Sequence, residues 1–318
     1  MKFAEVTGWG EESWDHDVTG VAVDSQDRVY VLRRGDDPVT VLSPDGTIVD
    51  RWGIGCFSNR PHLISIGHDD KVYVADDGGH RVLVFESSGR LLETIGTGSP
   101  SDTGYDAGAA SAEVAFERMP GGPPFNRPTK AAPSRNGELF VSDGYRNCRV
   151  HRFSRDRQQV RSWGRPGADE GCFVIPHSVT VDSEGRVLVC DRENDRIQIF
   201  SRDGEVAGVW NNVQRPTDVA FDRLGNVYVT ELPRGPLDLK SWRLGRAYEE
   251  LPGEVTMRLP DGAIIARLSC PGVEFLAPHA IAVDSTGAVY VSEVPESFAS
   301  YTGRPLRPHR CLRKFVPG

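Results

Sequence analysis

Three histidines occupy the same position in alternate repeats of this 318-residue sequence. When the repeats are aligned on their shared strings, one column alternates threonine with histidine: Thr19, His62, Thr129, His177, Thr217 and His279. If the six repeats close into a ring, the three histidines lie about 120° apart and point at its axis. Three convergent imidazoles with open positions for water or substrate are the ligand set of a catalytic zinc site. The column therefore predicts a zinc site at His62, His177 and His279.

A structural role is the alternative explanation of this column. Histidine and threonine can both act as small polar spacers near the axis, where they would bond to backbone groups. The remaining histidines lie outside the column, and we expect them at the surface: His16, His68, His80, His151 and His309.

Three further side chains fall near one end of the predicted strands. Tyr145, in the string VSDGYRNCR, follows an inner strand, and near a dication its phenol pKa would fall enough for general-base chemistry. Arg34 and Arg192 each lie ten residues after a repeat aspartate, so both should face one mouth of the ring and grip a carboxylate. The structural alternatives are packing of Tyr145 on the rim and pairing of the arginines with Asp36 or Glu193.

The repeats predict an all-β, six-bladed β-propeller. Each unit of roughly 40 residues carries four strand signals, as in 178–182, 186–191, 196–200 and a run ending at Trp210. The last repeat lacks a fourth strand, whereas the N-terminal residues end in Trp-Gly, as fourth strands do. We therefore expect the N-terminal strand to complete the last blade and close the ring, in one domain over residues 1–318.

Two insertions interrupt the repeat period, at residues 97–126 and 233–254. Both are candidate lids over one mouth of the ring, and Gly164–Phe173 is a third. The first insertion carries one short helix signal near Ser111–Met119.

An acidic column ends the second strand of five repeats, at Asp76, Asp143, Asp191, Glu231 and Glu293. In three of these repeats an arginine follows within a few residues: Arg81, Arg149 and Arg196. We interpret the column as structural carboxylate–guanidinium pairs, because buried polar groups must be satisfied in every repeat.

Composition restricts the partners of the chain. The net charge of −8 and the pI of about 5.6 argue against nucleic-acid and anionic-membrane partners, which require clustered Lys and Arg. No apolar run reaches transmembrane length and the start MKFAEVTGWG has no secretory pattern, so a cytoplasmic protein is expected. The six cysteines form no C-x-x-C motif and are expected to be free thiols.

Several strings resemble the peptidyl-α-hydroxyglycine α-amidating lyases, which belong to the NHL-repeat propellers. They include RPHLISI, PPFNRPT, VSDGYRNCRVHRFS, CDRENDRIQIF and APHAIAVD. The resemblance covers nearly the whole chain and is most specific between Pro123 and Phe200. A generic NHL repeat would not explain VSDGY, DREN and three Pro-His positions together.

The resemblance implies an NHL-type propeller that cleaves the N–C bond of an α-hydroxyglycine, giving an amide and glyoxylate. The site residues that it implies are the zinc ligands His62, His177 and His279, the catalytic Tyr145, and the active-site arginines Arg34 and Arg192. Ala280 stands where the family carries a calcium-binding aspartate, which argues against calcium in this chain. Arg146 replaces a disulfide cysteine, which is consistent with a reducing compartment.

Alternatives remain open for the function. The metal chemistry is expected to transfer better than the peptide substrate, so the substrate is a peptide or a small molecule that carries a carboxylate. A non-enzymatic NHL propeller that binds a protein or ligand is one alternative. Another propeller metallohydrolase is the other, although calcium-dependent hydrolases need Glu, Asn and Asp where this column has Thr and His.

Overall fold

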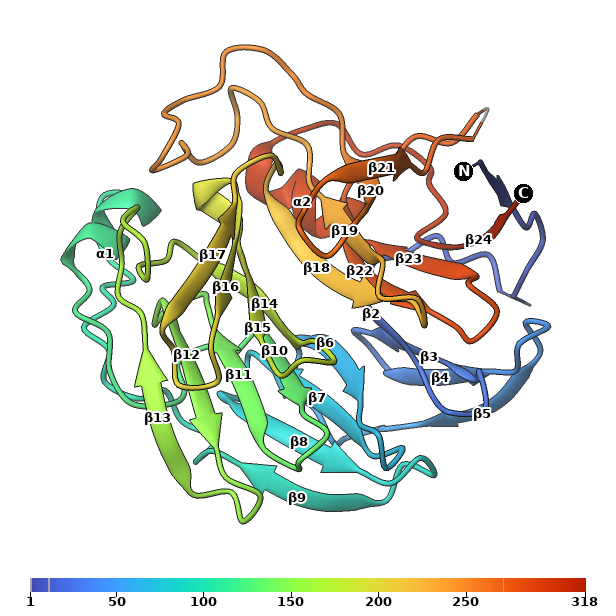
Figure 1. The fold of residues 1–318 in the computed structure, drawn as a ribbon, viewed down its shortest axis with the longest axis horizontal. Helices are drawn as coiled ribbons and strands as arrows, with labels where there is room; N and C mark the ends of the chain where they lie inside the picture. Colours follow the sequence, from blue (N-terminus) through green and yellow to red (C-terminus); the bar gives the residue numbers. More distant parts are fainter. Residues whose placement is uncertain (1, 11, 271) are drawn as a thin grey trace. The chain divides into compact units, whose positions relative to one another are not determined.

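The computed structural model describes residues 2–10, 12–270 and 272–318. The described residues form six four-stranded antiparallel sheets, and the fold is a six-bladed β-propeller, as predicted (Figure 1). The chain divides into two compact units of three blades each. The second unit comprises Phe57–Pro216 and Leu239–Arg246, and the first unit comprises the rest. One domain over residues 1–318 stays a prediction.

The second unit contains three consecutive blades, whose strands pair in chain order. Their bounds are β6 (Pro61–Ile66), β7 (Val72–Asp76), β8 (Arg81–Phe85) and β9 (Leu91–Ile95); β10 (Lys130–Pro133), β11 (Leu139–Asp143), β12 (Arg149–Phe153) and β13 (Gln159–Trp163); β14 (Pro176–Val181), β15 (Val187–Asp191), β16 (Arg196–Phe200) and β17 (Val206–Trp210).

The first unit contains the other three blades. Their strands are β2 (Val18–Val23), β3 (Val29–Arg33), β4 (Val39–Leu42) and β5 (Ile48–Trp52); β18 (Pro216–Phe221), β19 (Val227–Glu231), β20 (Glu254–Arg258) and β21 (Ile264–Arg267); β22 (Pro278–Val283), β23 (Val289–Glu293), β24 (Leu312–Pro317) and β1 (Phe3–Glu5).

Burial along one blade explains why its strands differ in sequence. Strands β15 and β16 are buried at every residue, whereas the outermost strand β17 is exposed or half-buried until Trp210. The inner strands pack on both faces, so they read as continuous apolar runs such as VLVC rather than as alternating patterns. The outer strand meets solvent and is anchored by the buried Trp210.

The N-terminal strand completes the last blade, as predicted. Strand β1 pairs with β24 in antiparallel register, with Phe3 opposite Pro317 and Glu5 opposite Phe315. The pairing covers the edge of β24, which would otherwise offer free backbone groups to another chain.

Glycine ends the fourth strands because the chain turns sharply there. Gly164 has φ +101°, and a Cβ atom at this position would lie 2.5 Å from the ring of Phe173. Gly96 has φ +106°, and its Cβ would lie 2.9 Å from the carbonyl oxygen of His80. Both the backbone conformation and the lack of space therefore require glycine.

Both insertions are present where the period predicts them. The first contains α1 (Ala112–Arg118), and the hydroxyl of Ser111 accepts the N-cap hydrogen bond from Val114 N at 3.3 Å, which confirms the helix signal. The second separates β19 from β20, and its segment Leu239–Arg246 belongs to the second unit.

A second helix, α2 (Pro295–Thr302), was not predicted. It begins with proline in its first turn and ends at Gly303, which has a left-handed conformation. This proline-first, glycine-last pair is the sequence signal that could have revealed it. Among the described residues, no helix is long and apolar enough to cross a membrane.

The acidic column makes the predicted arginine pairs in two of three repeats. Asp76 accepts from Arg81 Nε at 3.0 Å and Asp191 accepts from Arg196 Nε at 2.7 Å. The prediction is wrong for the third repeat, where Asp143 contacts Asn147 Nδ2 at 2.7 Å and His151 Nε2 at 3.2 Å instead of Arg149.

Two histidines that we expected at the surface, His151 and His309, lie inside the protein. His151 is fully buried because it serves as a partner of Asp143, and His309 pairs with Glu293 at 2.6 Å with a side chain 7% exposed. Each lies beside a carboxylate of the acidic column, and Glu293 also has Arg313 Nε at 3.8 Å. His16 and His68 are exposed, as expected.

We predict that Phe3→Ala destabilises the protein by about 3 kcal/mol, because Phe3 is buried and its ring packs edge-on against Tyr228 at 6.3 Å. Ala4→Ser on the exposed face of β1 is the control, with a change within about 0.5 kcal/mol. Urea denaturation measures both, and equal midpoints for the two variants would contradict the role of β1.

Candidate metal centre

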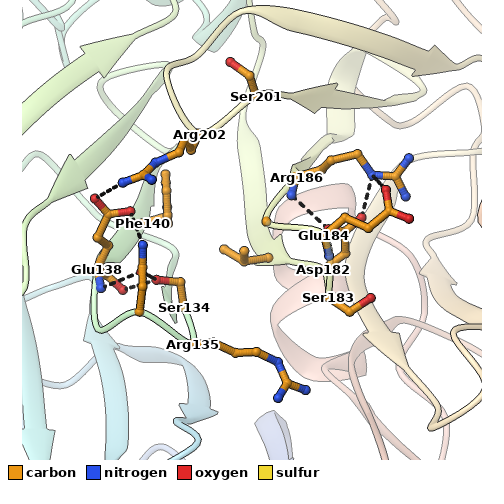
Figure 2. A pocket seen from close by; sticks show the side chains of 13 residues that line it. Ser134, Arg135, Glu138, Phe140, Asp182, Ser183, Glu184, Arg186, Ser201 and Arg202 are labelled. Carbon is orange, nitrogen blue, oxygen red and sulfur yellow. Dashed lines mark hydrogen bonds and ion pairs between the residues drawn. The ribbon is translucent and has the colours of Figure 1, made fainter.

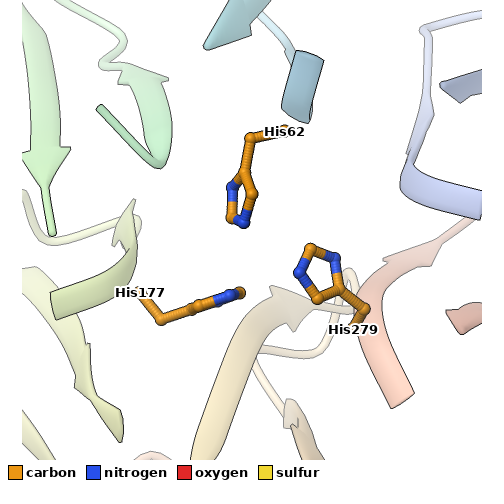
Figure 3. A group of neighbouring side chains, drawn as sticks. All are labelled: His62, His177 and His279. Carbon is orange, nitrogen blue, oxygen red and sulfur yellow. The ribbon is translucent and has the colours of Figure 1, made fainter. Parts of the chain in front are cut away.

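Figure 3 shows the three column histidines as neighbouring side chains. His62, His177 and His279 are all buried, and each offers one ring nitrogen that lies within 4.8 Å of the others. His62 and His177 belong to the second unit, where their ring centroids lie 4.8 Å apart at an interplanar angle of 68°. His279 belongs to the first unit.

Threonine carbonyls of the same column orient two of these rings. His62 Nδ1 lies 2.7 Å from the carbonyl oxygen of Thr129, and His279 Nδ1 lies 2.7 Å from that of Thr19. A carbonyl oxygen only accepts, so Nδ1 must carry the hydrogen in both rings. In the neutral imidazole, Nε2 then carries the lone pair with which the ring would bind a metal.

The threonine side chains hydrogen-bond to neighbouring strands. Thr129 Oγ1 lies 2.8 Å from Ser142 Oγ and 3.0 Å from the carbonyl oxygen of Pro176. Thr217 makes the equivalent contacts with Thr230 Oγ1 and the carbonyl oxygen of Pro278. The spacer interpretation therefore describes the threonine side chains. The contacts of the Thr129 and Thr19 carbonyls with His62 and His279 were not predicted from the sequence.

The hydroxyl of Tyr145 lies between two of the candidate ligands. It is 2.9 Å from His62 Nε2 and 3.3 Å from His177 Nε2. Tyr145 follows β11 by two residues, and its backbone N–H donates to the carbonyl of Arg127 at 3.4 Å. The structure thus brings Tyr145 together with His62 and His177 in one unit.

Arg192 lies beside Tyr145 in the same unit. It begins the single-turn helix η1 (Arg192–Asn194) directly after β15, and its guanidinium carbon is 5.7 Å from the centre of the Tyr145 ring. Its Nε donates to Glu193 Oε1 at 2.8 Å, so the alternative of a Glu193 pair is also observed. Burial lowers the pKa of Arg192, but the Glu193 carboxylate and Tyr145 raise it more, and the net pKa lies above its ordinary value.

Arg34 belongs to the first unit, where it is held by α2. Its NH1 donates to Ser297 Oγ at 2.8 Å, and Asp17 accepts from the Ser297 backbone N–H at 2.9 Å. The part of the chain that the structure describes contains no ion pair between Arg34 and Asp36, and no acceptor for the buried Arg34 Nε. The position of Arg34 beside Tyr145 and Arg192 stays a prediction.

A hollow of about 490 Å³ lies in the second unit, at the ends of the strands opposite to Tyr145 (Figure 2). Its charged side chains pair with one another: Arg186 Nε donates to Asp182 at 2.7 Å and Arg202 NH2 donates to Glu138 at 2.7 Å. No candidate ligand or base from the sequence analysis lines it. We interpret this hollow as a structural crevice between blades.

Comparisons with known proteins give the family. Residues 173–200 match the NHL repeat. NHL repeat-containing protein 3 of Mus musculus is 30% identical over 289 residues, which span 86% of this chain and 76% of the mouse protein. The chain belongs to the family of NHL repeat-containing proteins. The match to the Homo sapiens form, 34% identical over 178 residues, spans 54% of this NHL-repeat chain and 48% of that protein.

Several relatives of this NHL-repeat chain have names that state a reaction. Peptidyl-alpha-hydroxyglycine alpha-amidating lyase 1 of Drosophila melanogaster is 28% identical over 207 residues, 60% of this chain and 36% of the lyase. A solved structure of streptogramin B lyase covers 98% of this chain and 96% of its own, with a TM-score of 0.60 and 10% identity. At that identity the likeness shows the fold alone.

We predict that His177→Ala weakens zinc binding by more than about tenfold, because it removes one of three ligands. The control is His68→Ala, since His68 is exposed and lies outside the column. Elemental analysis after dialysis against limiting zinc measures the difference. Equal zinc content in the two variants would exclude His177 as a ligand.

Proposed function

We propose that this NHL-repeat protein is a zinc-dependent lyase that cleaves an α-hydroxyglycine-like carbinolamide into an amide and glyoxylate. The observation that carries the proposal is the hydroxyl of Tyr145, which lies within 3.3 Å of the Nε2 atoms of both His62 and His177. A potential base beside potential metal ligands is the arrangement that this chemistry needs. The similarity to the Drosophila lyase supports the same reaction class.

The donor set fits a zinc ion. His62, His177 and His279 would hold it, and the tautomers fixed at His62 and His279 offer neutral Nε2 donors. A bound zinc ion supplies Lewis acidity at this position. Calcium is not part of the proposal, because Ala280 offers no carboxylate at the position implied by the family resemblance.

Tyr145 is the proposed general base. As a phenolate it takes the proton from the substrate hydroxyl, the carbon–oxygen double bond of glyoxylate forms, and the carbon–nitrogen bond breaks. The electron pair goes to the nitrogen, which recovers a proton from Tyr145 and leaves as the amide. The step needs no oxidant and no added water, because the products together contain all the atoms of the substrate.

The arginines are the proposed carboxylate site. Arg192 stays cationic, and Arg34 has a buried Nε without an acceptor among the described residues. Guanidinium groups bind carboxylates in bidentate fashion, so both would hold the substrate while Tyr145 acts. The substrate is therefore a peptide or small molecule with a carboxylate, not a nucleic acid or a membrane. The six free cysteines support a cytoplasmic location.

A ligand-binding propeller without catalysis is the second candidate. Its support is the mouse relative, which matches most of this chain and whose name states a repeat but no reaction. Elemental analysis of the purified protein, alongside glyoxylate release from α-hydroxyhippurate, separates the two candidates. About one zinc per chain with glyoxylate release is the expected result, and a metal-free, inactive protein would support the binding propeller.

Tyr145→Phe is expected to lower the turnover of α-hydroxyhippurate by about 10²- to 10⁴-fold while zinc content and melting temperature stay unchanged, since only the proton acceptor is lost. Tyr105→Phe is the matched control, because Tyr105 packs against the same apolar cluster as Tyr145. Unchanged turnover in Tyr145→Phe would remove this residue from the mechanism.

A further inference from the structure

The Glu193 carboxylate lies between two arginines in the second unit. Its Oε1 accepts from Arg192 Nε at 2.8 Å and from Arg215 NH2 at 2.8 Å. The Glu193 side chain is fully buried, and those of Arg192 and Arg215 are 12% and 5% exposed. One negative charge thus faces two positive charges, and the group as a whole keeps a positive charge.

The bond to Glu193 fixes the direction of the Arg192 side chain. Glu193 binds the Nε edge of Arg192, and the guanidinium lies over the ring of Tyr145. A guanidinium that is bonded to a carboxylate through Nε can still offer its terminal nitrogens to a second, bidentate partner. Those nitrogens are the ones that a substrate carboxylate would use.

Backbone contacts hold Glu193 itself in place. Its N–H donates to the carbonyl of Val174 at 3.0 Å, and its carbonyl accepts from Trp242 N at 3.1 Å. Arg243 from the same insertion donates to the carbonyls of Asn194 at 2.9 Å and Asp195 at 2.7 Å. Hydrogen bonds therefore hold the turn η1 both to the segment before β14 and to the second insertion.

We propose that Glu193 is a positioning residue of the lyase reaction, which holds Arg192 in the direction needed for the substrate carboxylate, with Arg215 as the second arm that fixes the carboxylate of Glu193. This inference rests on the proposed function. The contact with Glu193 restricts the rotation of the long Arg192 side chain before the substrate binds. Less conformational entropy is therefore lost when the substrate binds. Glu193 acts through Arg192 and does not touch the reacting atoms.

The chain contains a matched control for this arrangement. Glu138 also lies between two arginines, accepting from Arg152 NH2 at 2.5 Å and Arg202 NH2 at 2.7 Å. It lies at the other end of the strands, in the crevice of Figure 2, away from Tyr145. Glu138→Gln therefore removes the same kind of charge from the same unit without touching Arg192.

The test compares Glu193→Gln with Glu138→Gln. We expect Glu193→Gln to weaken binding of hippurate, which carries the carboxylate but not the reactive hydroxyl, by about tenfold or more. The KM for α-hydroxyhippurate should rise by a similar factor, while zinc content stays that of the wild type. Glu138→Gln should change neither the affinity for hippurate nor the KM for α-hydroxyhippurate. Equal hippurate binding in the two variants would overturn the inference.

A double-variant cycle separates positioning from general structural support. In an Arg192→Gln background, Glu193→Gln should add less than about twofold to the loss of hippurate binding, because its target is already absent. The same factor in both backgrounds would overturn the inference. If Glu193→Gln fails to fold, Glu193→Asp replaces it: a shortened carboxylate should weaken hippurate binding, and wild-type binding would overturn the inference.

The outcomes distinguish this inference from the proposed function. A wild-type protein that neither binds hippurate nor releases glyoxylate from α-hydroxyhippurate would overturn both. A wild-type protein that does both, together with a Glu193→Gln variant that behaves like the wild type, would overturn the positioning role alone.

Discussion

The hydrogen bond from a histidine Nδ1 to a threonine carbonyl is the interaction on which the candidate metal centre depends. It fixes the tautomer and the rotation of His62 and His279, and it joins two repeats of one unit in each case. The threonine hydroxyl bonds the strands of its own blade and the next, so its carbonyl has no freedom to turn. In these two pairs the histidine is the candidate metal ligand, and the threonine carbonyl fixes the orientation of its ring.

The candidate site residues Tyr145 and Arg192 follow strands that are buried along their whole length. Tyr145 follows β11 and Arg192 follows β15, and in both places an aspartate ends the strand and collects hydrogen bonds from the loop. Burial raises the pKa of Asp191 to about 6, although Arg196 and Asn194 oppose this effect, so the carboxylate is largely ionised at neutral pH. The rigid strand and its terminal carboxylate together place the next two residues with little freedom.

Much of the fold and part of the site could be predicted from the sequence, because a repeat shows the same constraint six times. The blade pattern, the completing strand β1 and the column of His62, His177 and His279 all come from this periodicity. Features that occur only once in the chain cannot be predicted from the repeat period. Helix α2, the buried His151 and the Glu193–Arg215 pair depend on long-range packing, and nothing in their local sequence shows which partner lies nearby.

The pairing of β1 with β24 has a consequence for synthesis of the chain on the ribosome. Phe3 is made before the strands of all the other blades, whereas its partner Pro317 is made after them. The last blade therefore stays incomplete until β24 has been made, while the blades of the second unit can already assemble from neighbouring segments. Until β24 is available, β1 is an unpaired strand that carries an aromatic side chain, and an unpaired strand can pair with another chain.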